Sequence, residues 1–121
     1  MRESDRAEAR RKLDKEMRLF RQLAKRKNPA PGMLRSVRMA LGLRTAELAE
    51  KLGSSRTLVH RLERNEAQAA ITLKSLNRAA SAMGCTVVYG IVPKDGGTLE
   101  ELAEQRLWKK CFAFISQEPA A

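Results

Sequence analysis

The sequence predicts a mainly α-helical fold: a bundle of short helices, preceded by a basic helix and followed by one β-strand and a last helix. Three observations support this class. Apolar residues recur at helical spacing over most of the 121 residues. Glycines follow several of these runs, where helices commonly end. One run, residues 85–92, is instead rich in β-branched residues, as strands are.

The first helix is expected over residues 4–27, within a basic arm that covers residues 1–28. Leu13, Met17 and Phe20 recur at helical spacing and give it an apolar face. Basic residues outnumber acidic ones strongly in this segment. We expect the helix to pack through its apolar face and to leave its basic residues for an anionic polymer or for a protein partner. A disordered polybasic tail is the alternative.

The break Asn28-Pro-Ala-Pro-Gly32 ends the arm, because two prolines in three residues cannot continue a helix. Residues 29–84 then form a second part, with four short helices. Several of them are bounded by a glycine after the last turn or by Ser or Thr before the first. The expected helices are residues 34–41, 45–52, 55–64 and 72–83.

The third part, residues 85–121, begins with the expected strand, residues 85–92. A lone strand leaves backbone N–H and C=O groups unpaired, and the chain offers no second strand of similar quality. We therefore expect two copies of the chain to pair these strands in a homodimer. A toxin strand as partner, or cover by the last helix, are the alternatives. The residues expected in the dimer strand are Val87, Val88, Tyr89 and Ile91.

The last helix is expected to begin at the capping box Thr98-Leu-Glu-Glu101. Trp108 and Phe112 could belong to the core or to a surface that binds a partner, and we expect them in the core. Residues 118–121 are expected to fray.

Charge and composition restrict the classes of function. A formal net charge of +10 with 4% aromatic residues favours an anionic polymer as partner, and the scarcity of aromatics disfavours RNA. No apolar run approaches membrane-spanning length and no signal region follows the charged N-terminus, so we expect a cytoplasmic protein, associated with the nucleoid when it binds DNA. His60 lacks partners for metal binding or nucleophilic catalysis in the sequence, so we expect no enzyme activity, metal or cofactor.

The segment LGSSRTLVHRLE (residues 52–63) contains the strongest functional signal. As a helix continued to Arg64, it separates into an apolar side and a side with three arginines, a threonine, the only histidine and no acid. That polar side consists of Arg56, Thr57, His60, Arg61 and Arg64. It is either an ordinary solvated face or a binding surface, and its single sign of charge favours binding. The short turn at Gly53 and Ser54 is typical of two helices that cross steeply.

Arg38 and Glu63 lie at the edges of the apolar sides of two different helices. A half-buried carboxylate requires a partner, so these two residues are expected to form a buried ion pair. Two independent surface charges are the alternative.

The stretch LRSVRMALGLRTAELAEKLGSSRTLVHRLERNE resembles the Xre-type, phage-repressor-like helix-turn-helix over about residues 33–84. The wider order of segments resembles the family called mobile mystery protein A: a basic arm with a K-L-D-K run, the proline-rich break, this motif, and then residues 83–93. The resemblance implies a lambda-repressor-like bundle and a sequence-specific regulator that binds double-stranded DNA. It also implies a repressor or antitoxin that acts with a Fic-domain protein encoded next to it.

The same resemblance implies that Arg56, Thr57, His60 and Arg61 face DNA bases in the major groove. The residues expected at DNA phosphates are Arg44, Thr45, Ser55 and Arg64, although Xre-type domains commonly carry glutamine where Thr45 stands. A homodimer would read an inverted-repeat operator with half-sites about 34 to 36 Å apart. The alternative function is a protein-interaction module that neutralises a toxin by direct binding, with little role for DNA.

Overall fold

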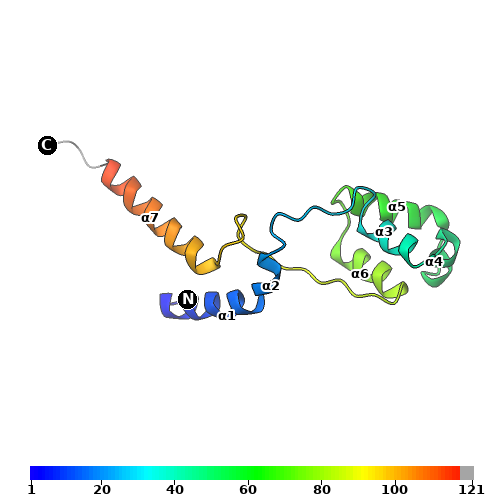
Figure 1. The fold of residues 1–121 in the computed structure, drawn as a ribbon, viewed down its shortest axis with the longest axis horizontal. Helices are drawn as coiled ribbons and strands as arrows, with labels where there is room; N and C mark the ends of the chain where they lie inside the picture. The colour runs from blue at the N-terminus through cyan, green and yellow to red at the C-terminus, as the bar shows by residue number, and fades with distance from the viewer. Residues whose placement is uncertain (118–121) are drawn as a thin grey trace. The chain divides into compact units, whose positions relative to one another are not determined.

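The computed structural model describes residues 1–117, and its chain divides into two compact units. The central unit is Lys27–Tyr89, and the terminal unit joins Met1–Arg26 to the chain from Gly90 onward. Every regular element in the described residues is an α-helix (Figure 1), so the expected mainly α-helical class is confirmed. The fraying expected for residues 118–121 lies outside the described residues.

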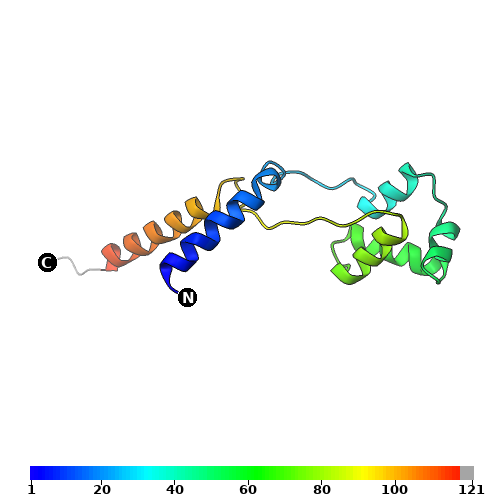
Figure 2. The ribbon, with the colours of Figure 1, turned by 90° about the horizontal axis from the view of Figure 1, so that it is seen from below.

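Four helices of the central unit gather around one apolar core (Figures 1 and 2). They are α3 (Met33–Ala40), α4 (Thr45–Lys51), α5 (Arg56–Ala67) and α6 (Leu73–Ala82). Helix α5 contacts each of the other three helices, and its Val59 has no exposed surface. The other buried residues of this core are Leu34, Leu48, Ala49, Leu52, Ala79 and Met83. Helix α5 is therefore held in place by three neighbouring helices.

Local sequence signals set the ends of these helices. The Ser55 hydroxyl accepts a hydrogen bond from the Leu58 N–H at 3.2 Å, and the Thr72 hydroxyl accepts one from the Ser75 N–H at 3.1 Å. Both side chains satisfy a donor that a helix start leaves without an intrahelical partner. Gly53, between α4 and α5, has a φ of 62°, which L side chains rarely adopt. The chain can therefore turn from α4 into α5 within a few residues.

Gly32, just before α3, is a position where only glycine fits. Its backbone has φ 94° and ψ 159°, a region that is essentially restricted to glycine. A Cβ atom there would lie 3.0 Å from Ala67 Cβ and 3.1 Å from Glu66 Oε1. That Glu66 oxygen accepts a hydrogen bond from the Leu34 N–H at 2.6 Å and so holds the start of α3 against α5.

We expect Gly32→Ala to lower the free energy of unfolding of the central unit by about 1 to 3 kcal/mol, because it adds backbone strain and crowds Glu66. Gly42→Ala is the matched control, since Gly42 also has a positive φ of 70° but nothing lies within 4 Å of a Cβ there. Urea unfolding followed by circular dichroism measures both variants. If both variants lose the same free energy of unfolding, the close approach of Gly32 to α5 adds nothing to the cost of the substitution.

The terminal unit contains α1 (Glu3–Glu16), α2 (Arg18–Arg21) and α7 (Leu99–Gln117), and α1 contacts α7. Neither α1 nor α2 has a fully buried residue. Met17 and Phe20 are half-buried, whereas Leu13 is 45% exposed and takes little part in the packing expected of it. This unit therefore depends more on polar contacts than the central unit does.

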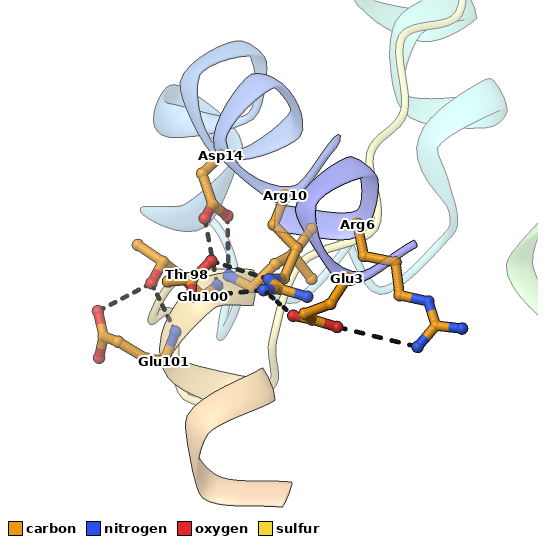
Figure 3. A network of polar contacts seen from close by, with 8 residues as sticks. Glu3, Arg6, Arg10, Asp14, Thr98, Glu100 and Glu101 are labelled. Carbon is orange, nitrogen blue, oxygen red and sulfur yellow. Dashed lines mark hydrogen bonds and ion pairs between the residues drawn. The ribbon is translucent and has the colours of Figure 1, made fainter. Parts of the chain in front are cut away.

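A polar network joins α1 to the start of α7 (Figure 3). The Asp14 carboxylate accepts hydrogen bonds from the Leu99 N–H at 2.8 Å and the Glu100 N–H at 3.3 Å. The Arg10 guanidinium donates from Nε to Glu100 Oε2 and from Nη2 to Glu3 Oε1, both at 2.8 Å. An acid from α1 thus satisfies backbone donors at the positive end of the α7 dipole.

The Glu3 carboxylate of this network has a lowered pKa. The hydrogen bond from Arg10 holds the pKa of Glu3 below its ordinary value of 4.5. A lowered carboxyl pKa adds stability that is present above the ordinary value and is lost as the pH falls through the lowered value. The contact between Glu3 and Arg10 within α1 should therefore weaken in acid, and salt should screen it because Glu3 is exposed.

The expected strand is wrong: residues 85–92 form no strand, and no second strand exists among residues 1–117 to pair with them. The segment crosses the boundary between the two units at Tyr89 and Gly90. A Cβ at Gly90 would lie 2.7 Å from Met17 Sδ, so the backbone here lies against α1 and α2 instead of a neighbouring strand. Of the four residues expected in the dimer strand, Val87 is half-buried and the others are exposed: Val88, Tyr89 and Ile91.

The expected core positions of Trp108 and Phe112 are also wrong. Their exposed fractions are 65% and 62%. Helix α1 contacts the beginning of α7 through Arg10 and Asp14, whereas these two aromatic residues lie further along α7. Their aromatic character predicted burial, but among the described residues more than half of the surface of each remains exposed.

Candidate nucleic-acid interface

Helix α5 has a buried side and an exposed basic side. Val59 and Glu63 are buried, and Leu58 and Leu62 are half-buried. The residues of the opposite side are all exposed: Arg56, Thr57, His60, Arg61 and Arg64. In the described part of the chain, no hydrogen bond or ion pair involves any of these five side chains. Their donors are therefore available to a ligand, and we call this surface the α5 basic face.

Arg38 of α3 and Glu63 of α5 lie together in the interior of the central unit. Arg38 Nε donates to Glu63 Oε1 at 2.5 Å, and Nη2 donates to Oε2 at 3.4 Å. Arg38 Nη1 also donates to the Leu43 carbonyl at 2.9 Å. The exposed fractions of the two residues are 9% and 7%. This two-pronged contact fixes the rotation of α5 about its axis and hence the direction of the α5 basic face.

Two further contacts that orient α5 were missed from the sequence. The Glu66 carboxylate accepts from the Leu34 N–H, and Arg78 Nη2 donates to the Leu52 carbonyl at 2.9 Å, next to the turn that leads into α5. The spacing of Glu66, three residues after Glu63 on the same side of α5, could have indicated the first contact. No pattern indicates the second, because its acceptor is a backbone carbonyl, which every residue carries.

The residues expected at DNA phosphates lie at helix starts and on the α5 basic face. Thr45 opens α4 and is half-buried, and Ser55 is the exposed N-cap of α5. Arg44 is exposed, but its Nε donates to Glu47 Oε1 at 2.8 Å. This contact lowers the pKa of Glu47 and raises that of Arg44. Arg44 is therefore already partly engaged, unlike Arg64.

The described residues contain little that suggests another kind of site. No group of three or more His, Cys, Asp or Glu side chains is placed to hold a metal ion there. Cys85 and Cys111 are exposed free thiols. No described helix is long and apolar enough to cross a membrane.

Comparison with known proteins identifies the central unit. A family model described as helix-turn-helix matches residues 34–89, slightly under half of the chain. Neither the curated proteins nor the solved structures give a match. The matched residues include α4, the turn at Gly53 and α5, together with the helices that pack on α5. Residues 34–89 are therefore similar to helix-turn-helix domains, and the arrangement of α3 to α6 around one core agrees with this match.

Proposed function

We propose that the protein is a sequence-specific transcriptional regulator, acting as a repressor, that inserts α5 into the major groove of double-stranded DNA. The observation that carries this proposal is the α5 basic face: five exposed side chains, none of them acidic, on a helix that three neighbouring helices and a buried ion pair hold in place. A recognition helix needs both free donors and a fixed orientation.

The side chains of the α5 basic face suit different parts of DNA. Arg56 and Arg61 can donate two hydrogen bonds to guanine O6 and N7, and Thr57 offers a hydroxyl and a methyl group. His60 can contact a base or a phosphate. The start of α5 at Ser55 favours a phosphate because free N–H groups and the helix dipole both attract anions. Arg64, Arg44 and Thr45 are the other proposed phosphate contacts.

We expect Arg61→Ala to weaken binding to the preferred site by about 1 to 3 kcal/mol and to relax preference at one base pair, because it removes a contact to a base edge. A preferred site can be selected from a random duplex pool. Binding of the wild type and the variant is then measured on that site, on its single-base variants and on scrambled DNA.

Arg64→Ala is the matched control on the same helix. Because Arg64 is a proposed phosphate contact, its loss should weaken binding to all sequences alike. It should also make the slope of log affinity against log salt concentration less steep by about one. If Arg61→Ala leaves the affinity ratio between the selected site and scrambled DNA unchanged, the α5 basic face does not read bases.

We propose an antitoxin role as a second candidate function, with a Fic-domain protein encoded nearby as the toxin. The order of segments outside residues 34–89, which resembles mobile mystery protein A, supports it. Arg61→Ala also separates the two ways in which a toxin could be controlled. Repression of the toxin gene should be lost in this variant, whereas neutralisation by direct binding should remain.

A further inference from the structure

One face of α7 lies outside the contacts with α1. It begins beside Thr98, and Glu101 there points away from Arg10 and Glu3 (Figure 3). Leu102, 39% exposed, lies at the edge of this face and also lines the groove between α1 and α7, and the two large apolar residues further along are Trp108 at 65% and Phe112 at 62% exposed. The rings of the last two lie side by side, with centroids 6.2 Å apart. We call this surface the outer face of α7; at helical spacing it comprises Glu101, Leu102, Gln105, Trp108, Lys109 and Phe112.

The charges along α7 are arranged symmetrically about Gln105. All its described acids precede this residue and all its bases follow it: Glu100, Glu101 and Glu104, then Arg106, Lys109 and Lys110. Each acid stands as far before Gln105 as one base stands after it. On the outer face, Glu101 mirrors Lys109, and Leu102 mirrors Trp108. A second α7 in antiparallel orientation would therefore meet this face with opposite charges opposed and apolar residues together.

A groove lies beside the outer face. Its volume is about 380 Å³, and it is lined by the loop Val92–Asp95 and by the first turns of α7, including Leu102 and Gln105. In the antiparallel arrangement, Trp108 of the second copy reaches Leu102, and its Phe112 reaches the first turn beside the loop. Buried aromatic anchors in such grooves supply much of the binding energy of protein interfaces.

We propose that the terminal unit forms a twofold homodimer in which the outer faces of two α7 helices pack antiparallel, with Trp108 of each copy in the groove of the other. A parallel pair would oppose like charges at positions 101 and 109, and it would align the two helix dipoles unfavourably. This interface replaces the strand pairing expected from the sequence, and it does not depend on whether the central unit binds DNA.

Sedimentation equilibrium of the full chain tests the interface. The wild type should dimerise at tens of micromolar, and Trp108→Ala should raise the dissociation constant by about a hundredfold, because both copies lose their anchor. Leu107→Ala is the matched control: Leu107 is 63% exposed, but it lines the opposite groove between α1 and α7. Both side chains are exposed, so neither variant should unfold the chain, and circular dichroism checks this.

Charge reversal gives a second test that is specific for the antiparallel arrangement. Glu101→Lys and Lys109→Glu should each weaken self-association by about tenfold or more, because each places like charges at two symmetric positions. Mixing these two variants should restore a heterodimer, because both opposed pairs then carry opposite charges. Lys110→Glu makes the same change on the neighbouring residue, away from the outer face, and should have a much smaller effect.

Three results would overturn the proposal. They are a wild-type monomer at tens of micromolar, equal dimerisation of Trp108→Ala and wild type, and two charge variants that remain monomers when mixed. A wild-type monomer whose outer face binds the neighbouring gene product would assign that face to a different partner. Each of these results leaves DNA binding by Arg61 to be decided separately.

Discussion

Glu63→Ala is expected to lower the free energy of unfolding of the helix-turn-helix domain by about 3 to 5 kcal/mol. The substitution leaves the Arg38 guanidinium buried without its carboxylate, and a stranded buried charge costs much more than a lost surface contact. Small domains are stable by only about 5 to 15 kcal/mol in total, so much of the domain's stability would be lost. Urea unfolding followed by circular dichroism measures the change.

Arg64→Ala is the control for this prediction, because Arg64 is the next residue of α5 and is exposed. Its effect on stability should stay within about 0.5 kcal/mol. Trp108, the only tryptophan, lies in the terminal unit, so its fluorescence reports whether that unit remains unchanged. If Glu63→Ala and Arg64→Ala have the same free energy of unfolding, the ion pair adds no stability.

Replacing both partners distinguishes the cost of a stranded charge from the net value of the pair. The double variant Arg38→Met, Glu63→Leu removes both charges and keeps apolar side chains in the interior, so it should be far more stable than Glu63→Ala. If the ion pair also orients α5, the double variant should fold well and still bind the selected DNA site less tightly than wild type. Circular dichroism and DNA titration of the same sample separate these effects.

The helices of the central unit could be predicted from the sequence because their signals are local. Ser55 and Thr72 are the N-caps of α5 and α6, and Gly53 follows the end of α4 with a positive φ. The side of α5 that faces solvent also follows from spacing alone. The pairing of Arg38 with Glu63 could be anticipated because each residue lies at the edge of an apolar stripe on its own helix.

The terminal unit could not be predicted in the same way, because distant residues form it. The contacts of Asp14 with Leu99 and of Arg10 with Glu100 join positions about 85 to 90 residues apart. The spacing of residues along α1 does not indicate that Asp14 will cap the start of α7. The wrong predictions of a strand at Tyr89 and of a core position for Trp108 have a related cause. Residue type indicates a preference for a strand or for the core, but the rest of the fold decides whether a strand or a helix packs against that residue.

The basic residues of α1 differ in how far the fold already engages them. Arg10 donates to Glu3 and Glu100, and Arg21 of α2 donates to the Asp14 carbonyl. Other bases of α1 are exposed and take part in no ion pair within the described residues, namely Arg11, Lys12 and Lys15. These three are therefore charges of α1 that remain available for DNA phosphate.

Neutralising these three residues together as glutamine should make the salt dependence of DNA binding less steep by about 2.7 in the log–log slope, if each contacts one phosphate. Between roughly 50 and 200 mM salt, the ratio of wild-type to variant affinity should then change by about fortyfold. The control variant neutralises Lys94, Arg106 and Lys110 and makes the same change in net charge. An equal effect of the control would reflect net charge alone. An unchanged slope in the α1 variant, with lost binding to the neighbouring gene product, would assign the arm to that protein instead.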